Sequence, residues 1–212
     1  MTGIHDFPAF LLASVALAVL PGPDTLYVLG RTVAQGRRAG LWSLAGIGGG
    51  CLGHVAASAL GLSALIAASP FAFELVKLAG ALYLAWIGVQ LLREAWQHAG
   101  DGVPLPAVAA DEAGGWQLLR QGVVTNLLNP KVGLFFISFL PQFVTPGVGT
   151  VGDFVLLGLT FVGIGLVWIL LLMHTTDLAT RHFRGRAAVQ RWFKGLTGGL
   201  FVGLAAKLAL DR

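Results

Sequence analysis

The stretch GLWSLAGIGGGCLGHVAASALGLSALIAASPFAF, residues 40–73, contains no Asp, Glu, Lys or Arg. A transmembrane helix needs about 20 largely apolar residues, so this run is long enough to cross a bilayer. Glycine and alanine recur throughout it, and small residues let the backbones of membrane helices approach closely. The stretch therefore predicts a buried spanning helix that packs tightly against a neighbour.

The same character extends along the whole chain of 212 residues, of which 56% are apolar and 11% charged. A soluble domain has about 25% charged residues, so the composition excludes a soluble catalytic or nucleic-acid-binding domain. We expect an all-α integral membrane protein with six transmembrane helices. The expected spans are residues 7–30, 40–68, 71–92, 118–144, 154–176 and 192–210.

The orientation follows from where the basic residues fall. Most Lys and Arg residues lie in the first, third and fifth loops, and an excess of these residues marks cytoplasmic loops. Both termini are therefore expected on the non-cytoplasmic side. The net charge of +4 has the same explanation and indicates no nucleic-acid partner. The segment before the first span contains Asp6 and no Lys or Arg, so we expect that span to be retained rather than cleaved as a signal peptide.

Residues 97–115, rich in Gly, Pro and Ala, are expected to form a flexible linker. They divide one membrane domain into two three-helix repeats, residues 1–96 and 116–212. An odd number of spans in each repeat forces the second copy to be inverted, as in many transporters. Residues 20–24 (LPGPD) align with residues 127–131 (LLNPK) in the first helix of each half. The chain is thus expected to be a 3+3 inverted repeat.

Proline breaks are expected in the first and fourth spans. Pro21 and Pro23 flank Gly22, and proline removes a hydrogen-bond donor and clashes with the preceding turn. Asn129 followed by Pro130 is the pattern of a helix N-cap and first helical residue. Each half would then present a helix N-terminus that favours carboxylates or phosphates. The alternative is a pair of kinks that only shape the bundle.

Asp24 and Lys131 follow the two breaks at equivalent positions. An ionised side chain within a membrane is costly and indicates function. The helix dipole stabilises a carboxylate at Asp24 but opposes an ammonium at Lys131, so Lys131 is the stronger candidate. The two side chains could bind the two ends of a zwitterionic ligand, or they could form a permanent salt bridge.

His54 and Cys51 lie within the uncharged second span. His54 is a candidate for proton relay, and a packing histidine is the alternative. The single cysteine excludes an intramolecular disulfide and a multi-cysteine metal site. No cluster of metal ligands, no H-E-x-x-H and no G-x-S-x-G motif is present. We therefore expect no metal, no cofactor and no enzymatic activity.

Several of these motifs together resemble the LysE/RhtB family of bacterial amino-acid exporters. They are residues 21–25 (PGPDT), 129–131 (NPK), 139–143 (FLPQF) and the glycine-rich second span with His54. The resemblance covers the whole chain and implies a secondary exporter in the bacterial cytoplasmic membrane, driven by the proton gradient. It assigns the family's motif roles to Pro21, Gly22, Pro23, Asp24, Asn129, Pro130 and Lys131, and with less support to His54.

The expected mechanism is alternating access around a site at the two broken helices. The carboxylate of an amino acid would bind there to half-helix amides and Lys131, and its ammonium to Asp24 or to carbonyls that the prolines leave free. Asp24 or His54 would carry the coupled proton. The expected partners are the amino acid, protons and membrane lipid, and the chain could also form a homo-oligomer. The rival functions are an exporter or channel for another small solute or metal ion, and a membrane-embedded enzyme.

Overall fold

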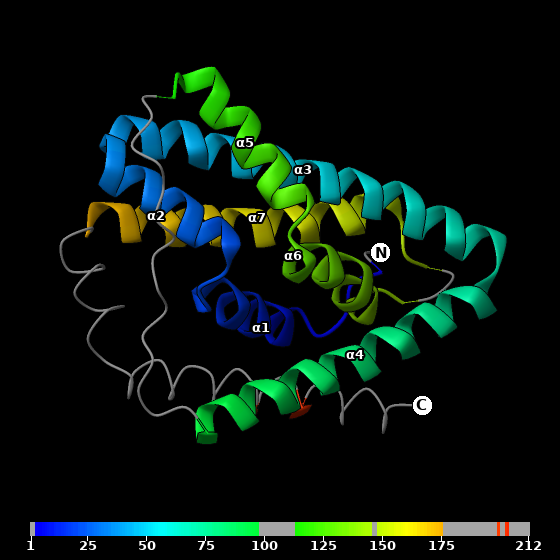
Figure 1. The fold of residues 1–212 in the computed structure, drawn as a ribbon. Coiled ribbons are helices and arrows are strands. Elements are labelled where there is room, and N and C mark those ends of the chain that lie inside the picture. The colour runs from blue at the N-terminus through cyan, green and yellow to red at the C-terminus, as the bar shows by residue number, and fades with distance from the viewer. Residues whose placement is uncertain (1–2, 98–112, 146–147, 176–198, 200–201, 204–212) are drawn as a thin grey trace.

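A computed structural model describes residues 3–97, 113–145, 148–175, 199 and 202–203 (Figure 1). Within these residues every regular element is helical, and the one β-bridge joins Ile4 to Val144. The long elements are α1 (Phe7–Val19), α2 (Pro23–Gln35), α3 (Arg37–Ala68), α4 (Pro70–Gln97), α5 (Gly115–Leu127) and α7 (Val151–His174). Between α5 and α7 lie α6 (Pro130–Leu134), the π-helical turn η1 (Phe135–Phe139) and the 3-10 turn η2 (Leu140–Phe143).

Two of the described helices, α3 and α7, are each long and apolar enough to cross a membrane. Two further candidate spans are bent pairs, in which α2 follows α1 at 46° and the segment Pro130–Phe143 follows α5 at 49°. The expected breaks in the first and fourth spans are therefore present. The expected third span lies within α4, whereas most of residues 192–210 and of the linker lie outside the described residues. The six-span inverted repeat stays a prediction.

The long helix α3 runs along one side of the fold and packs against α2, α5 and α7 (Figure 1). Its closest neighbour is α5, and the approach depends on glycine. A Cβ at Gly50 would lie 2.7 Å from Cβ of Asn126, and a Cβ at Gly122 would lie 2.6 Å from the carbonyl oxygen of Ser43. Gly46, Gly49, Gly50 and Gly53 thus face α5 and let its side chain at Asn126 come near α2.

The segment after α6 departs from α-helical geometry and is filled by aromatic side chains. Phe135, Phe139 and Phe143 follow one another through η1 and η2, with ring centroids 4.7 Å apart for the first pair and 4.8 Å for the second. Phe10 of α1 packs on this row, 6.0 Å from the ring of Phe139, and is fully buried. The first broken span is thereby fixed against the second, which holds the two breaks side by side.

Hydrogen bonds also secure the N-terminal residues. Thr150 and Asp153 form a capping box at the start of α7, and Oδ2 of Asp153 accepts a further bond of 3.2 Å from the Gly3 amide. The Thr145 amide donates to the Gly3 carbonyl at 2.8 Å. These bonds tie the residues before α1 to the end of η2 and the start of α7, at the end of the fold expected to be non-cytoplasmic.

Candidate functional site

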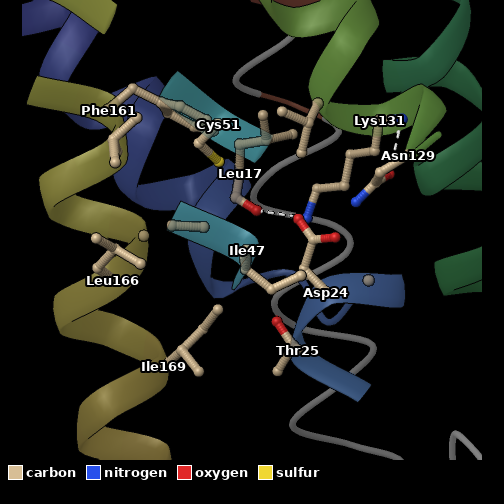
Figure 2. Close-up of a pocket in the computed structure, with 15 residues that line it drawn as sticks. Leu17, Asp24, Thr25, Ile47, Cys51, Asn129, Lys131, Phe161, Leu166 and Ile169 are labelled. Carbon is tan, nitrogen blue, oxygen red and sulfur yellow. Dashed lines mark hydrogen bonds between the residues drawn. The ribbon is translucent and has the colours of Figure 1, made fainter. Parts of the chain in front are cut away.

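The break in the first span leaves backbone carbonyls at the end of α1 without partners inside the helix. The Lys131 ammonium is their partner, because Nζ donates to the carbonyl oxygens of Leu17 and Leu20 at 2.7 Å each. Figure 2 shows the bond to Leu17. A cation at a helix C-terminus is also favoured by the helix dipole. One broken span thus supplies the charge that satisfies the exposed backbone of the other.

The local sequence around the second break fixes the backbone of Lys131. Oδ1 of Asn129 accepts a hydrogen bond of 3.0 Å from the Lys131 amide, and Pro130 occupies the first turn of α6. This is the N-cap expected for residues 129 and 130. The start of α6 opposes an ammonium, but the carbonyls at the end of α1 compensate, which explains how a lysine is accommodated at this position.

Asp24 lies in the first turn of α2, where Gly22 is the N-cap and Pro23 the first helical residue. It is 9% exposed, and its Oδ2 accepts a hydrogen bond of 2.8 Å from Nδ2 of Asn126. Its other oxygen, Oδ1, is buried and has no partner within hydrogen-bonding geometry among the described residues, although the Asn129 side chain lies beside the carboxylate. The carboxylate is therefore only half satisfied.

The salt bridge considered between Asp24 and Lys131 does not form in this structure. No ion pair joins the Asp24 and Lys131 side chains, because the Lys131 ammonium is engaged with the α1 carbonyls. The two charges are still near enough to attract one another. A cation and an anion are thus held close together without neutralising one another directly.

Asn126 of α5 is a further site residue that the sequence motifs do not indicate. Its side chain is fully buried, and besides its bond to Asp24 it lies 3.2 Å from Sγ of Cys51 as a donor. Its own Oδ1 is buried and has no hydrogen-bond partner among the described residues. No short motif contains this residue. The signal that the sequence does offer is a polar amide side chain in an otherwise apolar stretch, one turn before the break.

His54 lies beside this network rather than in it. Its Nε2 is 3.3 Å from the backbone oxygen of Asn126, and a carbonyl can only accept, so this contact requires the tautomer with hydrogen on Nε2. The imidazole stacks on Phe136 with ring centroids 5.6 Å apart. His54 therefore connects to Asp24 through Asn126. Its stacking on Phe136 fits equally well with the alternative, a histidine that serves only in packing.

The charged groups line a cavity of about 60 Å³ between the two breaks and α7. Figure 2 shows Phe161, Leu166 and Ile169 of α7 across the cavity from Asp24 and Lys131. The wall consists of Leu17, Ala18, Gly22, Asp24, Thr25, Ile47, Cys51, Asn129, Lys131, Val132, Phe161, Val162, Gly165, Leu166 and Ile169. An apolar enclosure with a few convergent polar groups is typical of a small-molecule site.

The predicted site residues divide into two kinds. Gly22, Asp24, Asn129 and Lys131 line the cavity, whereas the three prolines do not and act by placing the breaks. A Cβ at Gly22 would lie 3.4 Å from Cδ of Lys131, so a larger residue there would press on the lysine. Within the described residues no group of three His, Cys, Asp or Glu side chains could hold a metal ion.

Comparison with known proteins gives a match over nearly the whole chain. A family model described as LysE type translocator matches residues 15–212. The chain is 34% identical to an uncharacterised membrane protein of Pseudomonas aeruginosa, over 98% of this chain and 96% of that one. It is 30% identical to a leucine efflux protein of Enterobacter sp. (98% and 96% covered) and 29% identical to a threonine efflux protein of Escherichia coli K12 (97% and 98%). No solved structure matches significantly.

Proposed function

The chain belongs to the LysE type translocator family, and we propose that it exports an amino acid or a close derivative across the bacterial cytoplasmic membrane. The resemblance noted in the motifs is thereby confirmed. Because this is a family of transporters whose named relatives are efflux proteins, the chain is not an enzyme. Relatives named for leucine and threonine support an amino acid as the exported solute, since both carry the same zwitterionic backbone.

The observation that carries the proposal is the half-satisfied pair of charges on one cavity. The substrate carboxylate would bind the Lys131 ammonium and displace one of the two α1 carbonyls. The substrate ammonium would bind Oδ1 of Asp24, which is buried without a donor among the described residues, and would gain the displaced carbonyl as a second acceptor. A zwitterion thus offers a partner for each group that the empty cavity leaves incompletely satisfied.

The cavity also bears on how the site is reached. A volume of about 60 Å³ holds a few water molecules, so an amino acid with a large side chain needs the walls to separate. We propose that the second half, with α7, rocks against the first half and opens the cavity to one side at a time. This assumes the six-span, 3+3 arrangement in which inverted repeats alternate around a fixed site.

Proton coupling requires a titratable group that senses the substrate. Asp24 is the proposed carrier because substrate binding would change its hydrogen bonding directly. His54 is the second candidate, since it contacts the backbone oxygen of Asn126, whose side-chain amide donates to Asp24. An export assay in vesicles with an imposed pH gradient tests the coupling, and its collapse with a protonophore is the expected result.

Export of radiolabelled leucine and threonine from preloaded cells tests the function, with a panel of other amino acids as competitors. Lys131→Gln and Asp24→Asn should abolish export, because each removes one charge of the pair. Arg37→Gln provides the matched control, since Arg37 is exposed at the start of α3 and does not line the cavity. Export that persists in both cavity variants at equal protein levels would refute the proposal.

A further inference from the structure

A second, larger hollow lies on the outside of the helix pair α2 and α5. It has a volume of about 780 Å³ and is lined by Tyr27, Arg31, Trp116, Arg120, Gln121 and Val124, together with neighbouring polar residues of α5. It shares no residue with the cavity at the breaks. We call it the α2–α5 groove, and it lies where α2 ends and α5 begins, at the end expected to face the cytoplasm.

The described residues that line the groove include two arginines and no acidic residue. Arg31 donates from Nη2 to Gln121 Oε1 at 3.1 Å, but its Nε and Nη1 are buried without a hydrogen-bond partner in the described part of the chain. Its guanidinium carbon lies 6.0 Å from the centre of the Tyr27 ring. Arg120 is exposed and makes no hydrogen bond or ion pair with any described residue. Within the described part of the chain the two cations therefore have no anionic partner, which is costly for the partly buried Arg31.

The apolar side chains beside the arginines indicate the kind of anion. Trp116 is 68% exposed at the rim, and tryptophan is enriched at the headgroup level of membranes. Val124 and Leu127 follow Arg120 at helical spacing on α5 and are 53% and 47% exposed. Along α5 the surface thus passes from the indole of Trp116 through the guanidinium of Arg120 to an aliphatic strip directed toward the membrane interior.

We propose that the α2–α5 groove binds an anionic phospholipid, with its phosphate at Arg31 and Arg120 and an acyl chain along Val124 and Leu127. A phosphate offers several acceptor oxygens to guanidinium donors, and basic pockets between transmembrane helices at the cytoplasmic side bind anionic headgroups. A free amino-acid carboxylate would satisfy the arginines as well but would leave the aliphatic strip without an occupant. The lipid is therefore the better match.

Native mass spectrometry of the purified full-length protein tests this proposal, with phosphatidylglycerol and phosphatidylcholine as probes. The unmodified protein should retain phosphatidylglycerol in preference to phosphatidylcholine. Arg31→Gln with Arg120→Gln should reduce phosphatidylglycerol retention by at least about tenfold. The matched control is Arg37→Gln with Arg38→Gln, which removes the same charge from two exposed residues near the same end, outside the groove. Retention should be unchanged there.

Size-exclusion chromatography and thermal unfolding show whether the variants stay folded. Arg120→Glu alone is the second variant, because Arg120 is exposed and its replacement disrupts no hydrogen bond of the described residues, yet it should repel the phosphate. Equal loss of lipid in the groove and control variants would overturn the proposal, as would equal binding of the two phospholipids. Displacement of bound phosphatidylglycerol by millimolar leucine would assign the groove to substrate instead and would also overturn it.

Discussion

The bond between Asn126 and Asp24 gives the sharpest prediction about how the site is held. Asn126→Leu keeps a side chain of similar size at a fully buried position but removes the donor 2.8 Å from the Asp24 carboxylate. A hydrogen bond to a charged group contributes about 1.5–3 kcal/mol. Since 1.36 kcal/mol corresponds to a factor of ten, the coupling between the two residues should be roughly tenfold to a hundredfold in an equilibrium constant.

A double-mutant cycle measures this coupling directly. Unfolding of the unmodified protein, Asn126→Leu, Asp24→Asn and the double variant is followed in mixed detergent micelles. Asn126→Leu should destabilise the protein strongly when Asp24 is present and much less in the Asp24→Asn background, where no buried carboxylate is left without its donor. Additive effects, with a coupling below about 0.5 kcal/mol, would refute the assignment of Asn126 as the residue that positions Asp24.

Two further predictions use residues that are convenient probes. Cys51 is the single cysteine of the chain and lines the cavity, so saturating leucine should slow its alkylation by a small maleimide, whereas equal labelling rates would place the substrate elsewhere. Gly122→Val should lower the free energy of unfolding by about 1–3 kcal/mol, because it forces α5 away from the Ser43 carbonyl. Gly61→Ala is the control, since Gly61 has open space around it and its replacement should be neutral or stabilising. Thermal unfolding compares the two variants, and similar midpoints would contradict the close packing of α3 and α5.

Much of the framework was predictable because its causes are local. Proline geometry locates both breaks, and the N-cap chemistry of Asn129 holds wherever the helix lies in the fold. Scarcity of charge drew attention to Asp24 and Lys131, since a membrane interior tolerates few ionised groups. These inferences require no knowledge of which helices are neighbours.

The partners of those groups were not predictable, because they come from residues about a hundred positions away. The carbonyls of Leu17 and Leu20 that hold Lys131 belong to the other half of the chain. The proline break predicts that carbonyls are left free there, but it does not predict that the lysine of the second break binds them. Asn126 reaches Asp24 only because the glycines of α3 admit α5 so closely. Opposite charges suggested a direct salt bridge, and the free backbone at the break outcompetes it for the ammonium.

The central claim is that Lys131 recognises the carboxylate of the substrate and Asp24 its ammonium. It is tested most directly by equilibrium binding of leucine, leucinamide and 4-methylpentanoate to the purified protein and to Lys131→Gln and Asp24→Asn. The unmodified protein should prefer leucine over both analogues. Lys131→Gln should lose its preference over leucinamide while keeping that over 4-methylpentanoate, and Asp24→Asn should show the reverse. Preferences that are unchanged in both variants would contradict the account.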